Sequence, residues 1–266
     1  MLKKINGTVV LCILLAFCMC LPIFAENSSC HWYCKRNTEH KQPVLDQNMA
    51  FIEQYGGFYV DRKHGDNCPE KVVYLTFDAG YENGNIAKIL NVLKEENVPS
   101  AFFVLRNLIE RNPDLIQRMT REGHLVCNHS DSHKDMTKFS SKEELSQELK
   151  RLEDRYFELT GQKMAPYYRP PEGTFDERTL KYAYELGYQT IFWSFAYADW
   201  DNAKQPDPQL AKEKILSNIH NGAVILLHPT SETNALILKE VISVLKQEGY
   251  RFGTLDELTA SSPQPR

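Results

Sequence analysis

Charged and imidazole side chains stand at the ends of several short apolar runs in this sequence. Asp78, Arg169 and Asp199 end or closely follow three of these runs, and His129 and His228 end two others. Taken singly, an aspartate after a strand is usually a helix cap, and a histidine there is usually a satisfied polar residue. Five such residues at equivalent positions instead favour one shared site, with a base, an acid and groups that orient them.

Two histidines lie four residues apart in the segment HSDSH, which runs from His129 to His133. That spacing lets two imidazoles converge at a strand-to-helix corner, and imidazole is a ligand for Zn²⁺ and similar divalent ions. Two histidines four apart also commonly line one face of a helix without binding anything. Catalytic zinc sites usually have three protein ligands, so this pattern alone does not establish a metal site.

The elements that must position these residues follow a repeating pattern from residue 72 onward. Seven apolar runs alternate with six amphipathic segments, which predicts parallel β/α units and therefore a doubly wound sheet or a barrel. In either fold the carboxyl ends of the strands gather on one face, where active sites are built. No glycine-rich nucleotide-binding loop follows the first run. The expected strands are 72–77, 100–105, 124–129, 167–171, 190–195, 223–228 and 250–255, and the expected helices are 85–97, 113–123, 141–161, 177–187, 207–222 and 233–249.

The chain is expected to have four segments. Residues 1–25 carry two early lysines and an apolar run, which is typical of a signal peptide, or of an N-terminal anchor if the segment is not cleaved. Residues 26–70 form a polar, loop-rich N-terminal arm, residues 71–258 form the β/α barrel, and residues 259–266 form a disordered tail. Either interpretation of the first segment predicts an exported protein, in the extracellular or cell-envelope space.

Composition narrows the classes of protein further. The 266 residues, 42% of them hydrophobic, suit one domain, and we expect a monomer. The net charge is −4 and no basic block occurs, so nucleic acid is not expected as a partner. In an exported protein we expect a disulfide between Cys34 and Cys68, whereas Cys127, inside an expected strand, should stay a buried thiol.

Five sequence motifs carry a resemblance to a known family. TFDAGYENG, NHSDSH, YRPPEG, YADW and ILLH resemble, in this order, the motifs of the polysaccharide deacetylases, carbohydrate esterase family 4. The resemblance covers residues 70–258 and implies an irregular (β/α)7-type barrel with parallel strands. The segments WYCKRNTEHKQP and FDAGYENG also resemble the branch that de-N-acetylates muramic acid in spore cortex, where muramic δ-lactam is formed.

The resemblance implies a catalytic role for four of the residues described above. Asp78 matches the catalytic base, and Arg169 matches the residue that holds this base. His228 matches the catalytic acid, and Asp199 matches the carboxylate that orients it.

Further positions match the metal ligands and the walls of the substrate site. His129 and His133 match ligands of a divalent metal ion, Zn²⁺ in the first place, with Co²⁺, Mn²⁺ or Mg²⁺ as the other candidates. Substrate contacts are expected from Trp200 and Leu226, which match the wall for the acetyl methyl group, from the backbone N–H of Glu172, which matches the donor to the oxyanion, and from Tyr81, whose ring can line a sugar groove. Trp193 is expected in the core.

Hydrolysis of an unactivated amide requires such a set independently of the resemblance. A nucleophile must be made from water, which a divalent ion and a base such as Asp78 can do together. The developing oxyanion needs a cation and a fixed N–H donor. The amine leaves only when it is protonated, which needs an acid such as His228, kept cationic by Asp199.

Three positions depart from the family pattern. Most members have a second aspartate, a metal ligand, where this chain has Ala79, so we expect only two protein side chains to hold the ion, with water in the remaining positions. Glu82 and Asp131 could compensate, but helix-capping or surface roles fit them better. Ala196 also replaces a common aspartate. Glu172 stands where some relatives in the muramic acid branch carry a basic residue, and an acid there is unfavourable for a muramic acid carboxylate.

The leading prediction is therefore a metal-dependent hydrolase that removes N-acetyl groups from the peptidoglycan glycan strand, from muramic acid in spore cortex in the first place. One alternative is a deacetylase of N-acetylglucosamine in peptidoglycan or chitin oligomers. A different alternative is a barrel that binds glycan without catalysis, having lost a metal ligand at Ala79. Retention of the base, the acid and their orienting residues argues against that last alternative.

Overall fold

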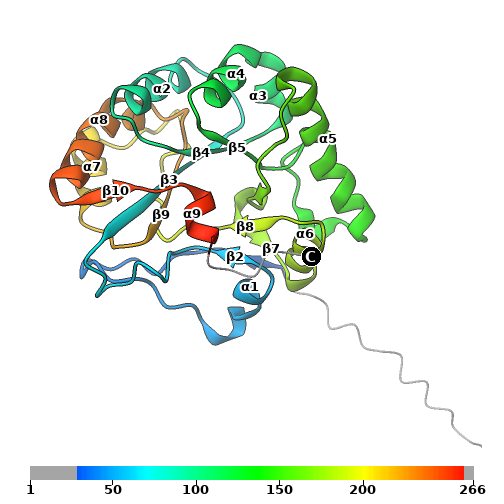
Figure 1. Ribbon diagram of the computed structural model, residues 1–266, viewed down its shortest axis with the longest axis horizontal. Helices are drawn as coiled ribbons and strands as arrows, with labels where there is room; N and C mark the ends of the chain where they lie inside the picture. The colour runs from blue at the N-terminus through cyan, green and yellow to red at the C-terminus, as the bar shows by residue number, and fades with distance from the viewer. Residues whose placement is uncertain (1–28, 261–266) are drawn as a thin grey trace, which may run out of the picture.

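A curled sheet of mainly parallel strands forms the centre of the molecule (Figure 1). The computed structural model describes residues 29–260. The sheet follows the order β10-β3-β4-β5-β6-β8-β2, and β9 pairs with the other side of β3. A bridge between Phe195 and Ile225 joins the segment after β8 to β9, so the sheet curls into a half-barrel. Its strands are β2 (Gly57–Phe58), β3 (Lys71–Ala79), β4 (Ala101–Val104), β5 (Leu125–Asn128), β6 (Tyr167–Tyr168), β8 (Gln189–Ile191), β9 (Ala223–Leu227) and β10 (Tyr250–Phe252).

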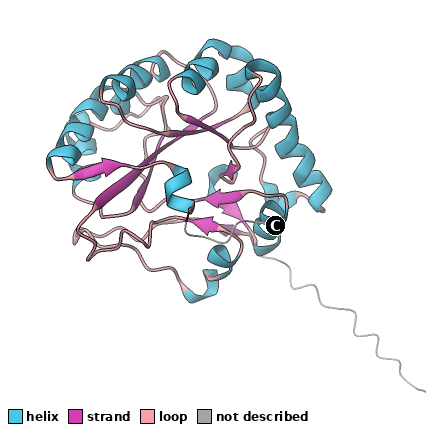
Figure 2. Ribbon diagram, viewed as in Figure 1, coloured by secondary structure: helices cyan, strands magenta, loops and turns pink. Residues whose placement is uncertain are grey.

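All seven apolar runs form strands, and the prediction of an irregular α/β barrel with parallel strands is confirmed, in the form of a half-barrel. The six expected helices also form, and they lie outside the curl of the sheet (Figure 2). They are α2 (Ile86–Glu95), α4 (Pro113–Arg121), α5 (Lys142–Thr160), α6 (Glu177–Glu185), α7 (Pro208–Leu216) and α8 (Glu232–Gln247). Short elements that the sequence did not indicate are α3 (Arg106–Arg111), α9 (Leu255–Thr259), η2 (Met136–Lys138) and η3 (Pro171–Gly173).

The alternation of side chains along β3 explains why Asp78 faces the inside of the barrel. Val73, Leu75 and Phe77 belong to the apolar cluster that includes buried residues of α2 and α8. Val72 and Tyr74 belong to a second cluster with residues of β4, β5 and β9, inside the curl. Successive side chains of a strand point to opposite faces, so position 78 continues the inner set.

The N-terminal arm is built into the sheet as well as wrapped around it. β2 pairs in parallel with β8, and β1 (Cys30–His31) pairs antiparallel with β7 (Thr174–Phe175). The arm also contains two short helical elements, η1 (Gln47–Met49) and α1 (Phe51–Gln54). The Trp32 ring stacks on Phe192, with ring centroids 4.6 Å apart. The arm therefore completes the barrel beside β8 (Figure 1).

Of the two predictions about the cysteines, the buried thiol of Cys127 is confirmed and the disulfide is wrong. Cys34, Cys68 and Cys127 are free thiols, and Cys127 is buried as expected. The expected Cys34–Cys68 disulfide is wrong, because both thiols are free and the two residues border different cavities. Cys34 borders pocket residues Trp32 and Tyr59, whereas the carbonyl oxygen of Cys68 accepts a hydrogen bond from the Asn221 amide, 3.3 Å away.

The structure tests the expectations for the two ends of the chain only in part. The expected leader, 1–25, lies outside the described residues, as does 261–266 of the expected tail. Thr259, which opens that tail, is instead buried at the end of α9. Within residues 29–260 no helix is both long and apolar enough to cross a membrane.

Candidate active site

A cavity of about 680 Å³ opens at the carboxyl ends of the strands. Eight of the ten site residues that the sequence predicted line it, and Arg169 and Asp199 lie buried behind two of them. Trp193, expected in the core, packs against two apolar clusters and also lines the cavity. The lining residues are Asp78, Gly80, Tyr81, Leu105, His129, His133, Glu172, Gly173, Trp193, Ala196, Tyr197, Trp200, Leu226, His228 and Thr230.

Asp78 is held by the fully buried guanidinium of Arg169. Nη1 of Arg169 donates to Oδ1 of Asp78 at 2.7 Å, and Nη2 donates to the Thr76 hydroxyl at 3.0 Å. Nε donates to the Ile191 carbonyl at 2.8 Å, and the guanidinium carbon lies 4.1 Å from the centroid of the Phe103 ring. These contacts fix the arginine, which in turn fixes the direction of the carboxylate.

The electrostatics of this pair keep Asp78 ionised. Burial alone would raise the pKa of the carboxyl, but the Arg169 guanidinium above all, with His129 and His228, holds that pKa below its ordinary value. A carboxylate with one oxygen on an arginine retains lone pairs on its other oxygen. Asp78 therefore has the charge and the free valence of a general base.

A second buried pair lies behind the opposite wall of the cavity. Oδ1 of Asp199 is 2.7 Å from Nδ1 of His228, and Oδ2 accepts from the His228 backbone N–H at 2.8 Å. With a proton on Nδ1, Nε2 is the ring nitrogen available in the cavity. Burial alone would lower the pKa of His228, but the hydrogen bond and charge of Asp199 raise it above its ordinary value. His228 is thus suited to donate a proton.

Asn234 on α8 completes this pair, and it was not among the site residues that the sequence predicted. Its Nδ2 donates to Oδ2 of Asp199 at 2.6 Å and to the His228 carbonyl at 3.1 Å. The Tyr197 hydroxyl bonds to its Oδ1, which fixes the orientation of the amide. The available signal was an asparagine among apolar residues on the buried side of an amphipathic helix, where an amide needs partners.

His129 and His133 converge beside Asp78. Their ring centroids are 5.0 Å apart, and Nε2 of His129 is 3.6 Å from Oδ2 of Asp78. Nδ1 of His129 lies 2.9 Å from the Arg169 carbonyl, so it carries the proton and leaves Nε2 as an acceptor. Burial lowers the pKa of His129 to about 4, so the ring is neutral at pH 7. Two converging imidazoles beside a carboxylate fit a divalent ion.

The loop that carries His133 is held by hydrogen bonds rather than by regular structure. Ser130 and His133 have φ values of 74° and 56°, in the left-handed region that non-glycine residues rarely adopt. The Asn128 side chain accepts from the Ser130 N–H, and the Ser130 hydroxyl accepts from the His133 N–H, both at 2.9 Å. The Ser132 N–H donates to the buried Glu148 carboxylate at 2.7 Å.

The two histidines are not part of a larger group of candidate metal ligands among the described residues. Within residues 29–260 no group of three or more His, Cys, Asp and Glu side chains is placed to hold a metal. Glu82 accepts from the Ile86 N–H at 3.0 Å and so caps α2, as expected. Asp131 is paired with Arg106 at 2.8 Å. Ala79 is fully buried in the apolar cluster between β3 and its helices and does not line the cavity.

The remaining predicted residues form the outer walls. Trp200 is exposed and its ring centroid lies 6.2 Å from that of His228, whereas Leu226 is buried. The Tyr81 hydroxyl accepts from the Asn202 amide at 2.7 Å. Glu172 has a φ of 56° at the mouth of the cavity, and its backbone N–H has no protein acceptor among the described residues.

Comparisons with known proteins agree with this geometry. A model of the polysaccharide deacetylase family matches residues 65–191. The peptidoglycan-N-acetylmuramic acid deacetylase PdaA of Bacillus subtilis is 39% identical over 233 residues, which cover 87% of this chain and 86% of that protein. This chain belongs to the polysaccharide deacetylase family. The structure of PdaA, a family 4 carbohydrate esterase, matches with a TM-score of 0.83 over 88% of this chain and 98% of its own.

Two other proteins are also similar to this polysaccharide deacetylase. A family 4 carbohydrate esterase from Bacillus anthracis is 38% identical in structure-based comparison, with a TM-score of 0.72 over 89% of this chain and 98% of its own. The peptidoglycan-N-acetylglucosamine deacetylase PgdA of Listeria monocytogenes is 36% identical over 188 residues, 71% of this chain and 39% of that protein. As a member of this family, the chain is a hydrolase that acts on an amide bond.

Proposed function

We propose that this polysaccharide deacetylase removes N-acetyl groups from peptidoglycan amino sugars, from N-acetylmuramic acid in the first place, as a step towards muramic δ-lactam in spore cortex. The observation that supports it most is the pair of dyads on one cavity, Arg169 with Asp78 and Asp199 with His228. The match with PdaA favours muramic acid. It extends over 233 residues, so it must include part of the N-terminal arm as well as the barrel. The match with PgdA is no longer than the barrel itself.

Asp78 acts as the general base of the reaction. Its free carboxylate oxygen takes a proton from the water that attacks the acetamide carbonyl carbon, and the carbon–oxygen bond forms as the carbonyl electrons move to oxygen. Arg169 keeps Asp78 ionised and aimed throughout. The free N–H of Glu172 donates to the oxyanion that develops on the carbonyl oxygen.

His228 acts as the general acid of the reaction. Protonated His228 gives its proton to the sugar nitrogen, the carbon–nitrogen bond breaks, and acetate and the free amine leave. Asp199 and Asn234 hold the ring in the orientation that this transfer needs. Leu226 and Trp200 enclose the acetyl methyl group, and Tyr81 lies against the sugar at the rim.

The histidine pair adds a metal requirement to the proposal. His129 and His133 would hold a divalent ion, Zn²⁺ in the first place or Co²⁺, Mn²⁺ or Mg²⁺, which when bound supplies Lewis-acid polarisation of the carbonyl and of water. The convergence of the two imidazoles beside Asp78, with His129 neutral at pH 7, supports this requirement.

A second candidate substrate is N-acetylglucosamine in peptidoglycan or chitin oligomers. The exposed acid Glu172 at the cavity mouth favours it, because an uncharged sugar meets no repulsion there. A glycan strand as substrate also implies an exported protein that works in the cell envelope, and we propose that it acts as a monomer.

Acetate release from defined glycans tests the proposal. The substrates are a peptide-free glycan with alternating N-acetylmuramic acid and N-acetylglucosamine, and an N-acetylglucosamine oligomer of the same length. We expect acetate from the first substrate in preference to the second, loss of activity with a chelator, and recovery with added Zn²⁺. Acetate release from the second substrate alone would favour the second candidate. No acetate release from either substrate, with metal present, would favour a barrel that binds glycan without catalysis.

A further inference from the structure

Residues 32–36 of the N-terminal arm run along the outside of one cavity wall. The Trp32 N–H donates to the Gly173 carbonyl at 2.8 Å, and the Trp32 indole N–H donates to the Trp193 carbonyl at 2.8 Å. Nη1 of Arg36 donates to the Ala196 carbonyl at 3.0 Å. Gly173, Trp193 and Ala196 all line the cavity. The arm is therefore attached to the substrate site at three successive points, and Arg36 is at the last of them.

The guanidinium of Arg36 has unused hydrogen-bonding capacity. Arg36 is exposed, and its bond to Ala196 uses one of the five N–H donors of an arginine. Within residues 29–260 no carboxylate pairs with it. An arginine anchored by one N–H at a backbone carbonyl, with the rest of its fork free, can bind a carboxylate through two parallel hydrogen bonds.

The charges around the cavity show why such a cation matters. The carboxylates on its lining are Asp78 and Glu172, and both repel an anionic substrate. Arg169 is fully buried and its N–H groups are directed to Asp78, Thr76 and backbone carbonyls. These bonds use four of its five N–H donors, and its full burial keeps a second carboxylate from reaching it. His228, the cationic side chain on the lining, is committed to proton transfer, so a cation for a substrate carboxylate is expected from outside the barrel.

The chemistry of the sugar indicates where that carboxylate must be. Muramic acid carries its lactyl ether on the ring carbon next to the one that bears the acetamide. When the acetamide is between Asp78 and His228, the lactyl group must lie close to the cavity rim. Ala196, which Arg36 contacts, belongs to the same short segment as Tyr197 and Trp200 on that rim.

We propose that Arg36 is a specificity-determining residue that binds the lactyl carboxylate of muramic acid. This inference rests on the proposed function and assigns its substrate preference to the arm instead of to position 172. It also explains how an acidic Glu172 is compatible with an anionic sugar, because the positive charge comes from a different segment of the chain.

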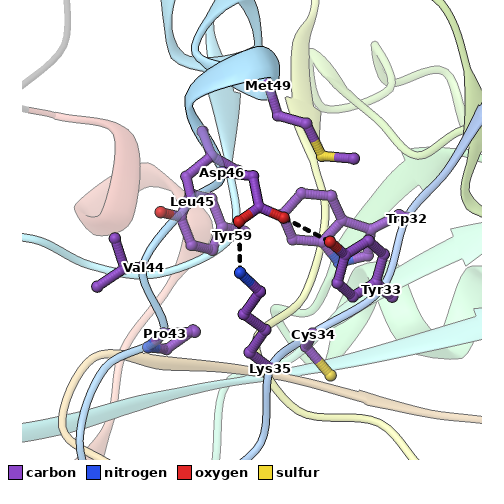
Figure 3. A pocket seen from close by; sticks show the side chains of 10 residues that line it. All are labelled: Trp32, Tyr33, Cys34, Lys35, Pro43, Val44, Leu45, Asp46, Met49 and Tyr59. Carbon is purple, nitrogen blue, oxygen red and sulfur yellow. Dashed lines mark hydrogen bonds and ion pairs between the residues drawn. The ribbon is translucent and has the colours of Figure 1, made fainter.

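Lys35, the adjacent residue, provides a matched control. Its ammonium is paired with Asp46, which also accepts from the Tyr33 hydroxyl at 2.5 Å, so its charge is already neutralised in the arm (Figure 3). No hydrogen bond joins Lys35 to Ala196, whereas one joins Arg36 to it. Lys35→Ala thus removes one positive charge next to Arg36 and leaves the cavity rim intact.

The experiment measures glycan binding and turnover separately. Dissociation constants are measured calorimetrically in an Asp78→Asn background, alone and with Arg36→Ala, Arg36→Lys or Lys35→Ala added. Three peptide-free ligands of equal length are compared: a muramic acid glycan, the same glycan with its lactyl carboxylate converted to the primary amide, and an N-acetylglucosamine oligomer. Acetate release from the same ligands is measured with Asp78 intact.

We expect Arg36→Ala to weaken binding of the free carboxylate glycan about tenfold, with a much smaller effect on the amidated glycan. Arg36→Lys should fall between, because it keeps the charge and loses the fork. Lys35→Ala should leave the preference for the free carboxylate unchanged. Equal weakening of all three ligands by Arg36→Ala, or no weakening at all, would overturn the inference. A carboxylate preference that depends on Arg36, without acetate release from muramic acid, would support the inference and refute the proposed function.

Discussion

Asp199 contacts His228 twice, through ring Nδ1 at 2.7 Å and through the backbone N–H at 2.8 Å. The first contact fixes the tautomer and the charge of the ring, and the second fixes the backbone that carries it. One buried carboxylate therefore controls both where the proposed acid points and when it holds its proton.

Asp199→Asn should move the alkaline limb of the pH–rate profile to lower pH. In the wild type, Asp199 raises the pKa of His228, so the acid keeps its proton to a higher pH than a free histidine, whose pKa is about 6.5. The amide removes the negative charge and with it the cause of the shift. The profile of kcat/KM from pH 5 to pH 10 on wild type and variant measures the effect. Superimposable alkaline limbs would contradict the assignment of His228 as the acid.

The same pair should give a pH-dependent contribution to stability. A histidine whose pKa is raised on folding contributes stability that is fully present below the unfolded pKa and is lost as pH rises through the folded pKa. The difference in midpoint of thermal unfolding between wild type and Asp199→Asn should therefore be larger at pH 5.5 than at pH 9. A difference that grows with pH would contradict the direction of the shift.

Asn234→Ala should reduce kcat about tenfold or more. It removes a hydrogen bond to a buried charged group, and such bonds contribute about 1.5–3 kcal/mol. A positioning role predicts a fall in kcat with little change in KM, and a shift of the alkaline limb towards that of Asp199→Asn. Asn91→Ala, on the exposed face of α2, is the matched control. A loss of stability without any change in kcat would reduce Asn234 to a packing residue.

Ala79→Asp should make stability depend on metal. Ala79 is fully buried among apolar side chains, so a carboxylate there loses its hydration and lowers the unfolding midpoint of metal-free protein. The family resemblance implies that an aspartate at this position reaches the ion. Added Zn²⁺ should then raise the midpoint more in the variant than in the wild type, because binding stabilises the folded state. Ala79→Asn is the uncharged control, and equal responses to Zn²⁺ in all three proteins would show that position 79 does not reach the ion.

The sequence predicted the barrel well because strand and helix alternate with clear periodicity. It located Asp78, His129 and His228 because each ends an apolar run, and parallel strands bring such ends together. It did not indicate β2, which is two residues long and gains its pairing only from β8. Periodicity says nothing about such tertiary partners.

The missed parts of the site share a physical cause. Asn234 lies in a strongly helical pattern, and its partners Asp199 and Tyr197 come from a loop far away in sequence. Arg36 lies in a polar arm without periodicity, and only the folded arm brings it to Ala196. Contacts between loops depend on the whole tertiary structure, so no local pattern contains them.

Acetate release from peptide-free muramic acid glycan, with Zn²⁺ present, is compared for wild type, Asp78→Asn and His228→Ala. We expect wild type to release acetate from muramic acid residues. Each variant should be slower by about 10²–10⁴-fold, with an unchanged circular dichroism spectrum, because each loses one general acid–base group. A wild type that releases no acetate, or either variant retaining most of the activity, would contradict the account.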